Sequence, residues 1–482
     1  MEIMKNQWLL VALAVFCGLA EEVECYYKSR MPNGFSISPA GKDQFQPILL
    51  SPSGDFALGF YRVEKDHFLL SVAFLLGKDE TKINATDIVW SANATNTVRE
   101  NSEFMQDASG SVALLDERGI AVWRVQAAPA PAVVALLDSG NLQVKTEAAV
   151  EWQSFDYPTD TLLEAQNFTA SMRVVAAGED YTLQMEAAGM ALTWKSGQVY
   201  WRRKAMQEKA LIIPEKGPIY ARLESDGYIA MYQSESQLVD VNPLDTYHQK
   251  LRVRRRLKLE ADGNLRAYYW RDEKRFWEVD FQALETPCQL PSTCGPYAIC
   301  GRDTGCTCLS AGGAAGCLKA MDSALFCSQT TALVRITGVD LPYSEFAPFV
   351  RVDSEQGCMD LCGGTCGCSA ALFYNDSKRC YQVPAPLPTL VQQPTQDKVA
   401  FIKFLNTTNN ERRSRCRSSK CKAVLILGCL AVVVGGLAAL GACVMAIWGC
   451  KLQEGKREIY IAMSEKFMAA LPYKNLNKDE AA

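Results

Sequence analysis

The distribution of cysteine constrains this chain more than any other feature. Twelve of its 19 cysteines fall between Cys288 and Cys380, whereas the stretch from Tyr26 to Pro287 contains none. A cysteine-free stretch of that length can bury its own core, but small cysteine-dense segments depend on covalent crosslinks. The sequence therefore predicts two architectures in series, a conventionally folded part followed by disulfide-rich modules.

The same cysteines argue against a metal centre. An even number of closely spaced cysteines in an oxidising compartment indicates disulfides. The zinc sites that combine cysteine with histidine also lack their histidine here, because the chain has only His67 and His248, and neither lies near the cysteines in sequence. We therefore expect disulfides, no metal and no cofactor.

Apolar segments near both ends predict a secreted-pathway membrane protein. Residues 1–20 combine a short apolar run with Gly18 and Ala20, which is typical of a signal peptide. Residues 423–448 contain no charged residue and are long enough, as a helix, to span a bilayer. Basic residues flank this span on both sides, so the orientation rests on the signal peptide. We expect a single-pass plasma-membrane protein with an extracellular N-terminus and a short cytoplasmic tail at 449–482.

Short motifs on both sides of the expected span fit this topology. A basic juxtamembrane segment at 406–422 precedes it. The tail contains neither a glycine-rich phosphate loop nor the length of a kinase domain, so we expect no kinase. Five N-glycosylation sequons lie on the extracellular side, at Asn84, Asn93, Asn167, Asn375 and Asn406. Two tyrosine-based sorting patterns lie in the tail, formed by Tyr460 with Met463 and by Tyr473 with Leu476.

The cysteine-free part has the pattern of short strands joined by tight turns. Between Phe35 and Lys145, apolar runs alternate with Ser-Gly and Asn turns, as β-hairpins do. Three of these turns share one form, at residues 53–55, 109–111 and 139–141, which indicates repetition of a short β unit. Similar turns recur further on, so we expect a second all-β domain and little helix before the membrane span.

Four strings in this part carry a resemblance to a known family. They are FALGFY at 56–61, IVWSANATNTV at 88–98, LLDSGNLQV at 136–144 and WQSFDYPTDTLL at 152–163. They resemble the bulb-type lectin domain of plant S-locus glycoproteins and G-type lectin S-receptor-like kinases. The order of the modules that follow, EGF-like and then PAN (apple-like), is similar too. The resemblance implies a mainly β fold with tandem β-prism lectin domains, two small disulfide modules and one transmembrane helix.

The resemblance also implies domain limits and disulfide pairs. The expected units are a bulb-type lectin domain at 26–166, a second lectin-like S-locus domain at 167–284, an EGF-like module at 285–320 and a PAN module at 327–405. Spacing alone leaves many pairings of the cysteines open. In the EGF-like module the family pattern implies Cys288–Cys300, Cys294–Cys306 and Cys308–Cys317. In the PAN module it implies Cys327–Cys366, Cys358–Cys380 and Cys362–Cys368.

A sugar site is the most specific function that this resemblance suggests. Bulb-type lectins hold mannose on a Q-x-D-x-N-x-V-x-Y strand, whose alternate side chains share one face. In the first domain this pattern is eroded, so we do not expect ordinary mannose binding there. The aligned positions are Leu137, Ser139, Asn141, Gln143 and Lys145.

The second domain has a closer match to the sugar pattern. Its residues on the right period are Glu260, Asp262, Asn264 and Tyr268, but Arg266 replaces the valine that would pack against the sugar ring. Two interpretations stay open, a modified carbohydrate site and a plain hairpin turn at residues 262–264. The turn is the favoured one.

The sequence therefore predicts a lectin-like cell-surface glycoprotein that binds an extracellular glycan or protein. It is expected to act as a kinase-less co-receptor, with a receptor kinase partner or as a homodimer. A structural adhesion glycoprotein that links the plasma membrane to the cell wall is the alternative. An enzyme is the weakest interpretation, because no hydrolase motif accompanies the two histidines. The net charge of −4 implies no nucleic-acid partner.

Overall fold

A computed structural model describes most of the chain up to Leu405. The chain divides into two units, residues 1–405 and 406–482. The described residues all lie in the first unit: 26–40, 42–77, 82–126, 132–195, 197–205, 216–234, 237–245, 253–309, 323–329, 331–393 and 397–405. Among them no helix combines the length and apolar composition that a bilayer crossing needs. The expected signal peptide, basic segment, membrane span, tail, Asn406 and tyrosine motifs lie outside these residues.

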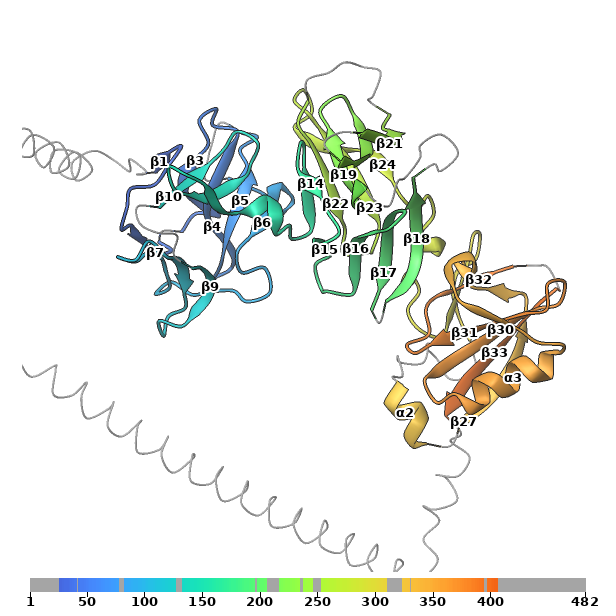
Figure 1. Cartoon of the computed structure of the whole chain (residues 1–482). Coiled ribbons are helices and arrows are strands. Elements are labelled where there is room, and N and C mark those ends of the chain that lie inside the picture. The colour runs from blue at the N-terminus through green and yellow to red at the C-terminus, as the bar shows by residue number, and fades with distance from the viewer. Residues whose placement is uncertain are drawn as a thin grey trace, which may run out of the picture. The chain divides into compact units, whose positions relative to one another are not determined.

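The first part of the chain folds into three sheets around one core (Figure 1). One sheet has the order β1-β3-β4-β5-β6, with β1 (Tyr27–Lys28), β3 (Phe45–Leu50), β4 (Phe56–Glu64), β5 (His67–Phe74) and β6 (Ile88–Ser91). A second has the order β2-β7-β8-β9, with β2 (Ser36–Ile37), β7 (Glu103–Gln106), β8 (Val112–Leu115) and β9 (Ala121–Val125). The third is β10-β11-β12, with β10 (Val133–Leu136), β11 (Leu142–Lys145) and β12 (Val150–Gln153). We call this part the first lectin unit.

The turns that the sequence predicted in this unit need glycine. Gly54, Gly110 and Gly140 have φ angles of 79°, 87° and 81°, in the left-handed region that favours glycine. At Gly140 a side chain would also meet the rings and methyl groups of Phe56 and Leu163, since a Cβ would lie 2.6 Å from Leu163. The repeated Ser-Gly turns are therefore confirmed as tight turns that feed apolar strands into the shared core.

The next part of the chain repeats the three-sheet arrangement. Its sheets are β13-β22-β23-β24, β14-β19-β20-β21 and β15-β16-β17-β18. We call it the second lectin unit, and its mainly β structure was predicted. The strands are β13 (Thr161–Leu163), β14 (Asn167–Phe168), β15 (Arg173–Val175), β16 (Tyr181–Glu186), β17 (Gly189–Trp194), β18 (Gln198–Lys204), β19 (Ile219–Glu224), β20 (Tyr228–Gln233), β21 (Gln237–Pro243), β22 (Arg255–Leu259), β23 (Leu265–Arg271) and β24 (Phe276–Gln282).

Strand β13 belongs to both lectin units, since Leu163 packs in the core of the first and Leu162 in the core of the second. β13 lies within the 26–166 range expected for the first unit, but it pairs antiparallel with β22 of the second, with Thr161 opposite Lys258 and Leu163 opposite Arg256. The backbone of β13 therefore completes a sheet of the second unit. The string WQSFDYPTDTLL resembles a single lectin motif, so the sequence does not show that its last residues pair with a strand of the second unit.

The cysteine-rich part forms two sheets that cross the expected module limits. One has the order β26-β25-β32-β28, with β25 (Ala298–Gly301), β26 (Gly305–Cys308), β28 (Val339–Asp340) and β32 (Leu390–Gln392). The other has the order β27-β33-β30-β31-β29, with β27 (Thr331–Thr337), β29 (Phe349–Arg351), β30 (Cys368–Tyr374), β31 (Arg379–Pro384) and β33 (Lys398–Leu405). Helix α3 (Glu355–Gly364) packs against the second sheet, and α2 (Ser323–Ser328) precedes it (Figure 1). Short 3₁₀ turns are η1 (Ala85–Asp87), η2 (Ser154–Asp156), η6 (Pro287–Gln289) and η7 (Ser344–Phe346).

The EGF-like hairpin is therefore joined to the PAN part. β25 pairs in parallel with β32, with Ile299 opposite Leu390 and Cys300 opposite Val391. Thr389 accepts a hydrogen bond at Oγ1 from the Cys294 backbone N–H at 3.1 Å. Because a short hairpin has little core of its own, pairing with a distant strand supplies the sheet that it lacks. The sequence had suggested separate modules in series, and the shared sheet corrects that picture.

Candidate ligand-binding site

The best sequence match to a sugar strand is closed by its own side chains. Tyr268 donates its hydroxyl to Glu260 Oε1 at 2.7 Å, and Arg266 forms a two-point ion pair with Asp262 at 3.1 and 2.7 Å. Burial, followed by the neighbouring Glu260, raises the pKa of the Tyr268 hydroxyl. Arg266, which stands where the family has valine, thus pairs with the Asp262 carboxylate that would otherwise hydrogen-bond a sugar.

The turn at the centre of that match is packed as well as paired. Asn264 is buried, and its amide donates to Leu284 O at 2.8 Å and accepts from Leu284 N at 3.1 Å. Tyr200 donates its hydroxyl to Gly263 O at 2.6 Å, and the Tyr181 ring lies 2.6 Å from where a Gly263 Cβ would stand. The four residues of the expected carbohydrate site are therefore held by partners within the protein, which favours the hairpin interpretation of Glu260, Asp262, Asn264 and Tyr268.

The corresponding asparagine of the first lectin unit also has a structural role. Asn141 donates to Gln153 Oε1 at 2.8 Å and accepts from the Ser154 hydroxyl and the Phe155 N–H, both at 3.3 Å. Gln143 donates to the same Gln153 oxygen at 3.2 Å. These contacts fasten β11 to β12 and to the turn that follows. They explain why an asparagine remains here although the rest of the mannose pattern is lost.

Three tryptophans, one from each sheet, meet in the first lectin unit. Trp90 of β6, Trp123 of β9 and Trp152 of β12 make edge-to-face contacts, with centroid distances of 5.2 to 5.9 Å. Trp90 also donates its indole N–H to Tyr157 O at 2.9 Å. Aromatic pairs of this geometry contribute about 1 kcal/mol each beyond buried area. Each tryptophan lies inside a short strand of a different sheet, so the sequence alone does not relate the three.

An open groove lies along the third sheet of the first lectin unit. Its volume is about 870 Å³. The N-terminal segment forms one wall, because Met31 N donates to Val134 O at 2.9 Å and Leu136 N donates to Ser29 O at 3.2 Å. We call it the third-sheet groove, and its lining includes Ser29, Arg30, Asn33, Pro52, Val133, Ala135, Leu137 and residues 145–150.

A neighbouring loop fixes a second wall of this groove. Ser53 N donates to Asp138 Oδ1 at 2.7 Å, which ties the loop containing Pro52 to the turn before β11. This backbone hydrogen bond is the main reason why the pKa of Asp138 lies below 3.8. The groove is therefore built by backbone pairing and a charged hydrogen bond.

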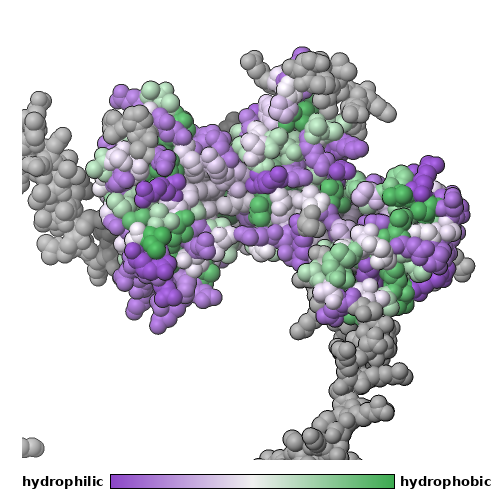
Figure 2. All heavy atoms as spheres, turned by 60° about the horizontal axis from the view of Figure 1, so that its bottom comes forward, coloured by the Kyte–Doolittle hydropathy of each residue, from purple (hydrophilic) through white to green (hydrophobic). Residues whose placement is uncertain are grey.

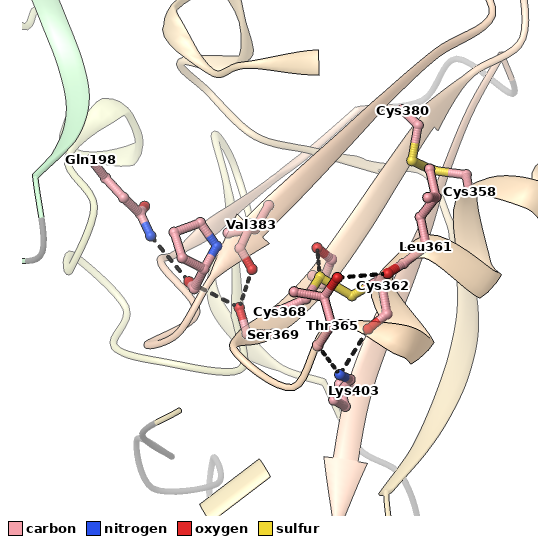
Figure 3. The surroundings of a disulfide bond; sticks show 12 residues. Gln198, Cys358, Leu361, Cys362, Thr365, Cys368, Ser369, Cys380, Val383 and Lys403 are labelled. Carbon is pink, nitrogen blue, oxygen red and sulfur yellow. Dashed lines mark hydrogen bonds between the residues drawn. A yellow bond between two sulfur atoms is a disulfide. The ribbon is translucent and has the colours of Figure 1, made fainter. Parts of the chain in front are cut away.

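Disulfides and a buried lysine fix the helix of the PAN part. Figure 3 shows Cys358 and Cys362 of α3 reaching the sheet, where they bond Cys380 and Cys368. The buried Lys403 amine donates to Cys362 O and Thr365 O, both at 2.9 Å, at the carboxyl end of α3. A cation there is favoured by the helix dipole, while desolvation lowers the pKa of Lys403.

The structure joins cysteines in the pairs that the resemblance implies, as far as they are described. Cys308 is disulfide-bonded, but its expected partner Cys317 lies outside the described residues. Three sulfurs of the hairpin lie within 4.8 Å of one another, yet all three belong to disulfides and are not free thiolates. The described disulfides are Cys288–Cys300, Cys294–Cys306, Cys327–Cys366, Cys358–Cys380 and Cys362–Cys368.

Comparison with known proteins places the parts of this chain in a family. A model of the D-mannose binding lectin domain matches residues 87–179, one of the S-locus glycoprotein domain matches 223–314, and one of the PAN domain matches 327–386. The PAN domain-containing protein At5g03700 of Arabidopsis thaliana is 31% identical over 92% of this chain and 90% of its own length. The chain belongs to the G-type lectin S-receptor-like family.

Receptor kinases of this G-type lectin family are also similar. The Arabidopsis thaliana kinase SD3-1 is 27% identical over 74% of this chain, and the Oryza sativa kinase LECRK3 is 24% identical over 81%. The chain spans only about half the length of these kinases, 49% and 52%. Among solved structures, the two-domain Scilla campanulata agglutinin is 13% identical over 55% of this chain and 97% of its own, with a TM-score of 0.21.

The expected glycosylation sites of this G-type lectin protein differ in accessibility. Asn84 and Asn167 are exposed and Asn375 is half-buried. Asn93 is only 4% exposed. Its amide donates to Phe68 O at 3.1 Å and Asn96 O at 2.8 Å and accepts from Leu70 N at 2.8 Å. The folded domain leaves no room for a glycan at Asn93, which corrects that expectation.

The PAN part of this family member presents hydrophobic side chains at its surface. Figure 2 shows such residues gathered on the part that carries α3 and β30 in Figure 1. Phe349 and Val350 of the edge strand β29 are 44% and 52% exposed, and they border a cavity of about 440 Å³. Exposed apolar edges of this kind are typical of contact surfaces.

Proposed function

We propose that this chain is a single-pass glycoprotein of the plasma membrane whose extracellular part binds a glycan or protein ligand. The observation that carries the proposal is the third-sheet groove, an open site on a lectin unit with walls fixed by Met31, Ser53 and Asp138. Lectin, S-locus glycoprotein and PAN domains are matched in series, so the proposed activity is binding and not catalysis.

The proposal extends to a role as a kinase-less co-receptor. Its support is that similar proteins are named G-type lectin S-receptor-like serine/threonine-protein kinases. The exposed β29 edge of the PAN part offers a surface for a receptor kinase or a second copy of this chain. Lectin units would then recognise the ligand while the PAN part contacts the partner.

Two measurements on the full-length protein test this function. Incubation with an array of glycans, together with chemical crosslinking in native membranes, should recover at least one extracellular ligand and a kinase-bearing receptor. Recovery of wall polysaccharide alone, with the protein immobile after plasmolysis, would favour the adhesion alternative. If neither a glycan nor a protein is retained, the proposed function is wrong.

A further inference from the structure

The third-sheet groove uses the face that would carry mannose in a conventional lectin strand. Leu142 and Val144 of β11 lie in the core, so Gln143 and Lys145 face the opposite way, and Lys145 lines the groove. Lys145 is opposite Val133, and Gln143 is opposite Ala135 on the neighbouring strand. The groove therefore lies where the family's sugar pattern runs, but it presents different chemistry.

The N-terminal wall adds a cation to this same face. Arg30 bridges antiparallel to Ala135, and residues directly opposite in an antiparallel pair point to the same side of the sheet. Arg30 and Lys145 consequently project from one face, two strands apart, which corresponds to about 10 Å across the sheet. The side chains of Val133 and Ala135 between them are too short to keep them apart.

Both cations are available for a ligand. Among the described residues, neither the Arg30 guanidinium nor the Lys145 amine has a hydrogen-bond or ion-pair partner. The groove lining also contains Glu147, so positive charge exceeds negative charge by one. The sugar pattern would have placed an aspartate at residue 139 and a tyrosine at residue 145, where this chain has serine and lysine. An acid is thus removed and a base added.

The remaining lining suits a sugar chain. Val133, Ala135 and Leu137 form an apolar floor against which the C–H face of a sugar ring can pack. A volume of about 870 Å³ is in the range of sites that hold an extended small ligand, and exceeds what one sugar ring needs. Separate cations two strands apart fit carboxylates on different residues of one oligosaccharide.

We propose that the third-sheet groove binds an oligosaccharide that carries uronate carboxylates, with Arg30 and Lys145 as the anion contacts. The inference rests on the proposed function, and it replaces the neutral hexose of the family's sugar strand by an acidic one. Charge-assisted contacts of guanidinium and ammonium groups with carboxylates supply the selectivity.

The test uses full-length protein and galacturonate oligomers of one length, either free or methyl-esterified. The free oligomer should bind at least tenfold more tightly than the ester, and its affinity should fall as ionic strength rises. Arg30→Gln and Lys145→Gln should each weaken binding about 5- to 10-fold, since each removes one charged hydrogen bond. Lys65→Gln, which removes an exposed lysine outside the groove lining, is the matched control and should leave affinity unchanged.

Several outcomes would overturn the inference. They are equal binding of free and esterified oligomers, no binding of either, unaltered affinity in both groove variants, and preference for an acidic peptide over the uronate. If a neutral glycan or a protein is retained and the groove variants do not matter, the proposed function stands while this inference fails. Unchanged thermal unfolding of the variants shows that any loss of binding is not a loss of fold.

Discussion

The two lectin units differ in what became of the sugar-binding strand pattern of their family. The second unit keeps more of the residues of that pattern, yet Glu260, Asp262 and Tyr268 are hydrogen-bonded or ion-paired within the protein. The first unit has lost most of those residues, yet it has an open groove whose two cations have no partner among the residues that the structure describes. Agreement with a motif therefore does not indicate an open site, because polar side chains that suit a sugar also suit each other.

One residue of the pattern is kept in both units for a reason unrelated to sugar. Asn264 holds both backbone groups of Leu284, and Asn141 holds Ser154 and Phe155. Each asparagine follows a glycine of positive φ, Gly263 at 90° and Gly140 at 81°. In each unit the asparagine therefore ties a hairpin turn to a later segment of the chain, and we call this contact the asparagine bracket.

The largest expected effect is on the closed turn of the second unit. Gly263→Ala should lower the free energy of unfolding by about 3 kcal/mol, because it adds a positive-φ penalty to a clash with the Tyr181 ring. Gly178→Ala is the matched control, since Gly178 has a φ of 92° but nothing within 4 Å of the added Cβ. It should cost about 1 kcal/mol.

Denaturant unfolding of the full-length protein compares these two variants. A similar loss in both would mean that the turn is not packed against Tyr181. The second unit would then have space above Gly263, and its contrast with the first unit would disappear.

The asparagine bracket predicts equal effects in the two units. Asn264→Ala and Asn141→Ala should each cost about 2 kcal/mol of unfolding free energy, because buried backbone or hydroxyl groups lose their partners. Asn33→Ala, at an exposed position of the groove wall, should be neutral. Thermal or denaturant unfolding measures all three, and a neutral result at Asn141 would separate the two units in this respect.

Arg266→Val tests whether one substitution separates the second unit from a sugar site. The variant restores the family's valine and breaks the ion pair with Asp262. In that pair the Arg266 side chain is 21% exposed and the Asp262 side chain 43%. The stability cost should be below about 1 kcal/mol, since partly exposed pairs contribute little. Retention on immobilised mannose should not increase, because Asn264 and Gly263 remain packed. A gain of mannose binding would show that Arg266 alone closes the site.

Local features of the fold could be predicted from the sequence, whereas distant pairings could not. The Ser-Gly turns were predictable because glycine is required by the φ of a single residue, as at Gly54. The meeting of Trp90 with Trp123 and the parallel pairing of Cys300 with Val391 depend on how separate strands are placed. In the same way the burial of Asn93 follows from strands around Phe68 and Leu70, which a three-residue sequon does not report.

The candidate site shows the same limit. The sequence drew attention to residues 260–268 because their letters matched, but it could not show that Arg266 and Asp262 would pair. In the sequence, Lys145 is only a departure from the mannose pattern. The sequence gives no signal at Arg30, because its role depends on an isolated bridge to Ala135, more than a hundred residues away in the chain.

The smallest effect concerns the loop that carries Pro52 in the groove wall. The Ser53 N–H bound to Asp138 holds the pKa of that carboxyl below 3.8, so its contribution to stability is full at neutral pH and is lost as pH falls through the lowered pKa. Asp138→Asn keeps an acceptor oxygen without the charge, and its unfolding free energy should lack this acid-range decline. Asp138→Ala removes the acceptor too and should already be less stable at neutral pH.

Unfolding measured from about pH 5 to about pH 2 compares the three proteins. Identical acid profiles for wild type and Asp138→Asn would mean that the charge does not fix this wall, leaving the groove with only its backbone pairing to keep it open.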